Sequence, residues 1–133
     1  MAGKVALITG GSRGLGAEIA WAFAHEGADV VVASRKLGPC GGLAAELHAE
    51  TGVRALGLSA HVGQWDAMQT LVDQVYEEFG HLDILVNNAG IAPTYDSLDQ
   101  ASEELFDKVV GVNLKGPFRL TALAAMRMAA DRG

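Results

Sequence analysis

Four glycines follow a short apolar run near the start of the chain. Residues 4–16 read KVALITGGSRGLG, with glycines at positions 10, 11, 14 and 16. Glycines at such positions allow a sharp turn and let main-chain N–H groups approach an anion without an intervening Cβ. A helix that follows would add the positive end of its dipole. The spacing therefore predicts a loop that binds the pyrophosphate of a dinucleotide, although the same glycines also suit a tight strand-to-helix turn without a ligand.

The elements around this loop are those of a βαβ unit. Residues Val5–Ile8 predict a strand that is buried on both faces, and Ala28–Ser34 predict a second one. Between them lies a helix that ends at Gly27 and carries one apolar stripe, formed by Leu15, Ile19, Ala22 and Phe23. This context favours the dinucleotide loop over the bare turn.

The alternation of strands and helices continues along the chain. Residues 35–42 are rich in Gly and Pro and predict a loop, followed by a short helix that ends at Thr51–Gly52. A third strand is expected at Ala55–Ala60, then a helix that stops at Gly80, then a fourth strand at Ile84–Asn87.

The last third of the chain predicts a loop and an interrupted helix. Residues 91–101 form a polar loop, and Ser102 has the character of an N-cap. Glycines and a proline should bend or break the helix near Asn113, before a second segment from about Phe118 to Ala130. The whole order predicts an α/β fold, a Rossmann-type doubly wound parallel sheet, in one domain over residues 1–133.

Three motifs resemble the short-chain dehydrogenase/reductase family. The loop Thr9-Gly10-x-x-x-Gly14-x-Gly16 is similar to the family's TGxxxGxG rather than to Gly-x-Gly-x-x-Gly. Residues 82–90, LDILVNNAG, resemble its Asn-Asn-Ala-Gly motif, and Asn113 in VNLKG matches its catalytic asparagine. The resemblance covers essentially the whole chain and implies a sheet with the strand order 3-2-1-4. The alternative for Asn113 is structural, a polar side chain that satisfies backbone groups at a helix kink.

The resemblance also implies a set of cofactor-binding residues, which follow the carboxyl ends of the four strands. They are Gly10, Ser12, Arg13, Gly14, Leu15 and Gly16, then Ser34 and Arg35, then His61 and Val62, and finally Asn88, Ala89 and Gly90. His61 stands where the family commonly has an aspartate for the adenine amino group. A histidine can accept that hydrogen bond or stack, and the Val62 backbone is the alternative contact. Thr9 and Asn87 are expected to be structural, tying the first and fourth strands together.

Charge at the end of the second strand favours NADP over NAD. NAD-binding chains usually carry an acid there, which accepts hydrogen bonds from the ribose 2′-OH and would repel a 2′-phosphate. This chain instead has Ser34, Arg35 and Lys36 in succession, and Arg13 lies in the glycine loop. The serine can donate to a 2′-phosphate and the arginines can pair with it, as basic residues at these places do in the family. The alternative is that both arginines are solvated surface charges.

The family resemblance implies hydride transfer to or from a carbonyl or alcohol, with a catalytic serine, tyrosine, lysine and asparagine. Only the asparagine, Asn113, has a match, because Tyr76 and Tyr95 are not followed four residues later by lysine. Without a fifth strand, the apolar fourth strand would also be an unprotected sheet edge. We therefore expect the N-terminal part of a longer NADP(H)-dependent oxidoreductase, inactive by itself. The alternatives are a natural truncation, a non-catalytic dinucleotide-binding fragment and an assembly module.

Composition narrows the remaining function classes. The 133 residues are half apolar, enough for one ordered core, and the formal net charge of −6 argues against nucleic-acid binding. The single cysteine, Cys40, excludes an internal disulfide, suits the cytosol and is expected to be an incidental loop residue. The histidines lack metal-ligand spacing, and no apolar run has membrane-spanning length. We expect a cytoplasmic protein with a small-molecule partner, while the resemblance implies a homo-oligomer.

Overall fold

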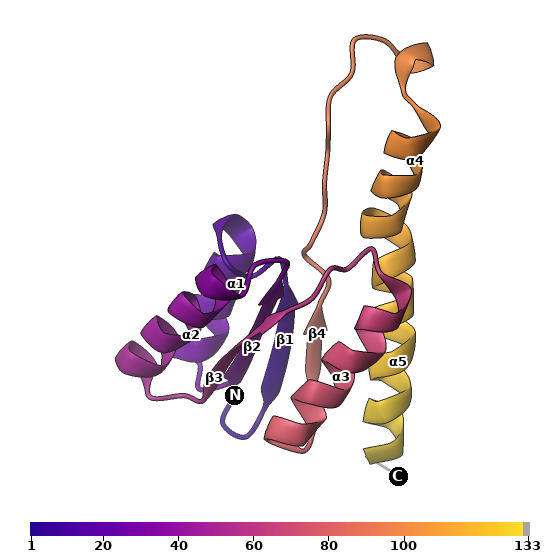
Figure 1. Cartoon of the computed structure of the whole chain (residues 1–133). Coiled ribbons are helices and arrows are strands. Elements are labelled where there is room, and N and C mark those ends of the chain that lie inside the picture. The colour runs from indigo at the N-terminus through magenta and orange to yellow at the C-terminus, as the bar shows by residue number, and fades with distance from the viewer. Residues whose placement is uncertain (132–133) are drawn as a thin grey trace.

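A parallel four-stranded sheet forms the centre of the molecule (Figure 1), which a computed structural model describes over residues 1–131. The strands lie in the order β3-β2-β1-β4, and each neighbouring pair is parallel. Their bounds are β1 Val5–Thr9, β2 Asp29–Ser34, β3 Ala55–Ser59 and β4 Ile84–Val86. The predicted α/β class and the strand order 3-2-1-4 are confirmed.

Helices cover both faces of this sheet. Helices α1 (Gly14–His25) and α2 (Leu37–Thr51) lie on one face, and α3 (Trp65–Phe79) and α5 (Gly116–Asp131) on the other (Figure 1). In the part of the chain that the structure describes, no helix is long and apolar enough to cross a membrane.

A further helix stands beyond the carboxyl ends of the strands. The connection after β4 runs away from the sheet to the short helix η1 (Leu98–Gln100) and returns through α4 (Glu103–Val110), which leads into α5 (Figure 1). Ser102 is the N-cap of α4, as predicted, because its hydroxyl accepts a hydrogen bond from the Leu105 N–H at 3.0 Å.

Each face of the sheet has its own apolar core, because side chains alternate along the strands. On β2, Val31 and Ala33 pack with residues of α3 and α5, whereas Val30 and Val32 pack with residues of α1 and α2. The central strands are therefore buried on both faces, as their unbroken apolar runs predict.

Helix α2 corrects the prediction of a loop over residues 35–42. It begins at Leu37, and its buried side chains, Cys40, Leu43, Ala44 and Leu47, follow helical spacing. Pro39 lies in the first turn, where a missing N–H breaks no helical hydrogen bond. Packing against the sheet therefore outweighs the low helix propensity of this segment.

Helix α1 packs through a different face from the one its large side chains indicate. The buried residues are Gly16, Ala20 and Ala24, while Leu15 is 70% exposed. Small residues at this spacing bring the helix axis close to the sheet. The predicted stripe is therefore wrong at Leu15 and at Ala22, which are both exposed, although Ile19 and Phe23 still pack against the edge of the core.

The predicted break near Asn113 is replaced by a π-helical segment, η2 (Gly111–Lys115), so the chain stays helical from α4 into α5. Gly111 and Gly116 both have right-handed helical dihedral angles. A Cβ on Gly116 would collide with the carbonyl oxygen of Val62, so glycine permits a close approach there. Single π turns of this kind absorb an extra residue without ending a helix.

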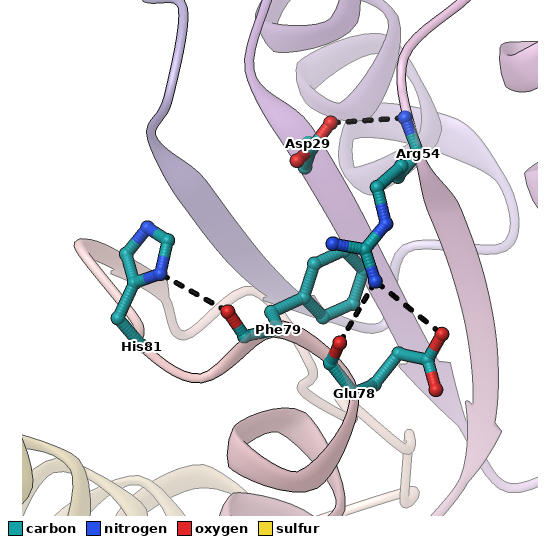
Figure 2. Close-up of polar contacts among 5 residues, drawn as sticks. All are labelled: Asp29, Arg54, Glu78, Phe79 and His81. Atoms are coloured by element: carbon teal, nitrogen blue, oxygen red, sulfur yellow. Dashed lines mark hydrogen bonds and ion pairs between the residues drawn. The ribbon is translucent and has the colours of Figure 1, made fainter.

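The amino ends of the strands are tied together by a cluster around Arg54 (Figure 2). The Arg54 guanidinium lies 4.4 Å from the centre of the Phe79 ring and donates to the Glu78 carbonyl oxygen at 2.8 Å. The main-chain N–H of Arg54 donates to the Asp29 carboxylate at 2.9 Å. The cluster joins the starts of β2 and β3 to the end of α3, and Nδ1 of His81 lies 3.1 Å from the Phe79 carbonyl oxygen.

Candidate cofactor site

A cavity of about 630 Å³ opens at the carboxyl ends of the strands, opposite the Arg54 cluster. Its lining comes from the segments that follow all four strands and from α4 and η2. The residues are Gly10, Ser12, Arg13, Gly14, Ser34, Arg35, Lys36, Pro39, Ala60, His61, Val62, Asn88, Ala89, Gly90, Ile91, Lys108 and Val112. The volume is in the range of cavities that bind cofactors, and the place is the usual ligand site of open parallel sheets.

The glycine loop exposes main chain to this cavity. Gly10 and Gly14 have φ values of +63° and +58°, a left-handed conformation that favours glycine. Nothing lies within 4 Å of a Cβ built on Gly14, so open space faces its main chain. A Cβ on Gly16 would collide with the Gly10 carbonyl oxygen, which explains how α1 can start so close to β1.

Two helix N-termini point unpaired donors toward the same region. Arg13 and Lys36 are the N-caps of α1 and α2, and neither side chain makes a capping hydrogen bond within the described residues. The first turns of these two helices contain no acidic residue in the described chain, in contrast to Glu103 and Glu104 of α4. Such uncapped N-termini favour an anion, since both the free N–H groups and the helix dipole attract negative charge.

The charged side chains that line the cavity are all basic. They are Arg13 and Arg35, and the lysines Lys36 and Lys108; no aspartate or glutamate belongs to the lining that the structure describes. Because the chain carries a formal net charge of −6, this concentration of positive charge is local to the cavity. The arrangement attracts a ligand with several negative charges.

Two hydroxyl groups hold the corner between β2 and α2. The Ser34 hydroxyl donates to the Lys36 carbonyl oxygen at 3.2 Å, and the Ser59 hydroxyl donates to that of Arg35 at 3.0 Å. Cys40 Sγ lies 2.9 Å from Ser34 Oγ. Cys40 is fully buried in α2, so the prediction that it lies in a loop is wrong.

Thr9 ties the first and fourth strands together, as predicted. Its buried hydroxyl accepts hydrogen bonds from the N–H groups of Asn88 and Ala89, both at 3.1 Å. The Asn88 side-chain amide donates to the Gly10 carbonyl oxygen at 3.0 Å. Asn87 does not share this task, because its amide donates to the Thr121 hydroxyl of α5 at 2.9 Å.

His61 lines the cavity as a donor rather than as an acceptor. Its Nδ1 accepts a hydrogen bond from the Gly63 N–H at 3.0 Å, which assigns the proton of a neutral ring to Nε2. An adenine amino group needs an acceptor, so the expected contact through a histidine nitrogen does not fit this ring. Stacking on the ring and the Val62 backbone remain predictions for the adenine contact.

Asn113 lies outside the cavity lining and bonds Ile91 through both polar atoms of its side-chain amide. Its Oδ1 accepts from the Ile91 N–H at 2.8 Å, and its Nδ2 donates to the Ile91 carbonyl oxygen at 2.7 Å. The pair joins η2 to the segment that follows Gly90. This arrangement matches the structural alternative for Asn113, backbone satisfaction at a helix irregularity.

Eleven of the predicted cofactor residues line the cavity, and their role as cofactor contacts stays a prediction. Leu15 and Gly16 do not line it. Sequence reasoning missed Lys108 and Val112, which also line the cavity. They stand one helical turn apart, but this spacing indicates a cavity wall only when α4 is known to face the cavity. Within residues 1–131, no group of three His, Cys, Asp or Glu side chains could hold a metal ion.

The family model described as short chain dehydrogenase matches residues 4–133. An uncharacterized oxidoreductase of Thermotoga maritima is 43% identical over 133 residues, which cover 98% of this chain and 51% of that protein. The chain thus spans about half the length of the curated relatives it matches.

Solved structures also match this chain. A metagenomic short-chain oxidoreductase in complex with NADP has a TM-score of 0.93 and 32% identity, over 99% of this chain and 59% of that one. An NAD⁺-bound xylitol dehydrogenase has a TM-score of 0.91 and 27% identity, over 98% of this chain and 50% of that one. The two similar structures therefore carry different cofactors.

Proposed function

This chain belongs to the short chain dehydrogenase family, and from that premise we propose that it is the cofactor-binding part of an NADP(H)-dependent oxidoreductase that acts on a carbonyl or alcohol. The oxidoreductase family and the Rossmann-type fold are established by the match over residues 4–133 and by the sheet order. The choice of NADP over NAD, the substrate class and the roles of single residues are the proposal.

The observation that carries the proposal is the sign of the charge in the cavity. Arg35 and Lys36 follow directly after β2, where an NAD-selective chain would carry an acid, and Arg13 faces the same cavity from the glycine loop. NADP differs from NAD by one phosphate on the adenosine ribose. A guanidinium can bind that phosphate with two parallel charge-assisted hydrogen bonds.

The uncapped start of α1 supports a pyrophosphate position beside the glycine loop. The open space next to Gly14 lets a phosphate approach the main chain, and the unpaired N–H groups of the first turn donate to it. When bound, the nicotinamide would supply hydride transfer. These residues would hold the cofactor still, while Asn88 and Thr9 keep the ends of β1 and β4 in register.

A proton-transfer set for this reaction is absent from the 133 residues, which contain no Tyr-x-x-x-Lys pair. We therefore propose that the whole protein supplies the serine, tyrosine and lysine from residues other than these. Asn113 would act through the position of the Ile91 backbone at the edge of the cavity.

The proposed function includes self-association. Several large apolar side chains are exposed along α4, η2 and α5: Phe106, Leu114, Phe118 and Met126. Apolar groups that gather on neighbouring helical elements favour burial against another surface. We propose that a second copy of the chain covers them.

The proposal is tested by titrating the purified chain with NADP⁺ and with NAD⁺ and measuring both dissociation constants by calorimetry. NADP⁺ should bind more tightly. Arg35→Ala should weaken NADP⁺ by about tenfold to a hundredfold, because a hydrogen bond to a charged group contributes about 1.5–3 kcal/mol. The affinity for NAD⁺ should hardly change.

Lys4→Ala is the matched control, since Lys4 is an exposed cation before β1, at the opposite end of the sheet. It removes one positive charge without touching the cavity and should leave both constants unchanged. Tighter binding of NAD⁺ by the unmodified chain would contradict the proposal. If Arg35→Ala weakened the binding of NADP⁺ and of NAD⁺ equally, the charge of Arg35 would not distinguish the two cofactors.

A further inference from the structure

A buried thiol, that of Cys40, contacts the corner between β2 and α2 that carries Arg35 and Lys36. Cys40 is 0% exposed, and its Sγ lies 2.9 Å from the Ser34 hydroxyl oxygen. Ser34 lies at the end of β2, half-buried, at the wall of the cavity. Cys40 does not line the proposed cofactor site itself, but its chain neighbour Pro39 does, and its thiol contacts the wall of the cavity at Ser34.

The direction of these hydrogen bonds follows from the number of protons. A serine hydroxyl has one proton, and Ser34 donates it to the Lys36 carbonyl oxygen at 3.2 Å. The short contact between sulfur and oxygen then needs a proton from the thiol, so Cys40 donates to Ser34. The result is a chain of two hydrogen bonds from Cys40 through Ser34 to the main chain of Lys36.

These hydrogen bonds fix the main chain at the corner. Two carbonyl groups belong to the basic residues that line this part of the cavity, and that of Lys36, the N-cap of α2, points into the helix. Ser34 binds the carbonyl oxygen of Lys36, and Ser59 binds that of Arg35. Both oxygens are thereby held by donors of the protein, while the N-terminus of α2 and the two basic side chains remain for a phosphate.

Cys40 itself has little freedom to move. Its main chain lies against β3, where a Cβ on Gly57 would be only 2.5 Å from the Cys40 carbonyl carbon. The helix is thus seated directly on the sheet at this residue. Because the main chain of Cys40 is held against β3, its thiol fixes the position of the Ser34 hydroxyl oxygen.

We propose that Cys40 is a positioning residue for cofactor discrimination: through Ser34, its thiol holds the corner of Arg35 and Lys36 in the arrangement that receives a 2′-phosphate. The inference rests on the proposed function, since it assumes that the cavity binds NADP(H). It assigns to Ser34 a role in holding the main chain rather than in donating to the phosphate.

The test compares Cys40→Ala with Cys40→Ser in the intact chain, with NADP⁺ and NAD⁺ titrated against each. Removing the donor should weaken NADP⁺ by about two- to tenfold, the effect of one neutral hydrogen bond, and leave NAD⁺ unchanged. The serine variant keeps a donor and should restore the preference. Ser34→Ala should have the same effect as Cys40→Ala, and the double variant should add nothing further, because both remove one chain of bonds.

Leu47→Val is the matched control, because Leu47 is also fully buried in α2 but lies two helical turns from Cys40. It should lower the thermal midpoint without changing the ratio of the two dissociation constants. If the unmodified chain prefers NADP⁺ and Cys40→Ala keeps that ratio, the inference is wrong while the proposed function stands. If the unmodified chain prefers NAD⁺, the proposed function fails and the inference with it.

Discussion

At the scale of the residue, Asn113 binds one partner through both polar atoms of its side-chain amide. Both polar atoms of the amide bond the backbone of Ile91, 22 residues earlier in the chain. The two bonds fix the first residue after the Asn-Asn-Ala-Gly segment against the π turn. Asn113 therefore shapes the rim of the cavity even though it does not line it.

Replacing Asn113 with alanine should release this rim. Two partly solvated hydrogen bonds disappear, and the free energy of unfolding should fall by about 1–2 kcal/mol. Hydrogen exchange at the Ile91 amide should become faster. Asn113→Asp keeps the acceptor for the Ile91 N–H but loses the donor, so its exchange rate should lie between those of the other two proteins. An Ile91 amide that exchanges at the same rate in Asn113→Ala would show that these bonds do not hold the segment.

The sequence predicted which residues line the cavity better than it predicted their individual hydrogen bonds. The positions of Ser34 and Arg35 follow from the end of an apolar strand, which is visible in the sequence. The donor role of the His61 ring does not, since it depends on the Gly63 N–H that happens to face Nδ1. Hydrogen-bond partners within a loop are set by tertiary geometry, which no spacing rule contains.

At the scale of the element, helix α2 depends on a missing side chain in the strand beneath it. Gly57 of β3 leaves room for the main chain of α2 at Cys40 and Gly41, at 2.5 and 2.6 Å from a built Cβ. This contact lets a segment with three glycines and a proline remain helical. Its stability comes from the sheet rather than from its own residues.

The pair Gly57→Ala and Gly41→Ala separates these two contributions. Alanine at position 57 would meet main-chain atoms that cannot move aside, and overpacking of this kind costs about 1–3 kcal/mol. Alanine at position 41 faces open space inside a helix and should stabilise the protein by roughly 0.5–1 kcal/mol. Urea unfolding measures both. A Gly57→Ala protein with an unchanged midpoint would contradict a tight contact between α2 and β3.

The elements that sequence reasoning predicted best are those with strong periodicity. All four strands and α3 appear close to their expected bounds, because apolar runs and a clear helical face belong to the residues themselves. The start of α2 and the π turn at η2 were missed, since glycine and proline normally predict a break. Both elements persist because a glycine permits close packing beside them. The main chain of α2 lies where a Cβ of Gly57 would stand, and the main chain of Val62 lies where a Cβ of Gly116 would stand.

At the scale of the whole molecule, one group of exposed apolar side chains lies on the helical elements beyond and beside β4. Phe118 is 65% exposed and Met126 is 72% exposed, both on α5. Among residues 1–131, β4 pairs with β1 alone, so its second edge lies on the same side of the sheet as these helices. This is the side of the molecule that we propose a second copy covers.

Phe118→Lys should therefore shift the purified chain toward the monomer. A charge in a desolvated contact lacks a partner and opposes association. Sedimentation velocity at several concentrations measures the change. Leu98→Lys is the control, because Leu98 is 83% exposed on η1, away from α5, and should leave the mass distribution as it is. A monomeric unmodified chain at high concentration would refute the proposed self-association.

The Arg54 cluster and the cavity stand at opposite ends of the same strands, and this separation bears on how the protein can evolve. Arg54, Phe79 and Glu78 join the amino ends, whereas every cavity residue belongs to the carboxyl ends or to the helices above them. A mutation in the cluster should change how firmly the sheet is held without altering the residues that line the cavity. Selection can therefore adjust thermal tolerance at one end and cofactor choice at the other, each with little cost to the other trait.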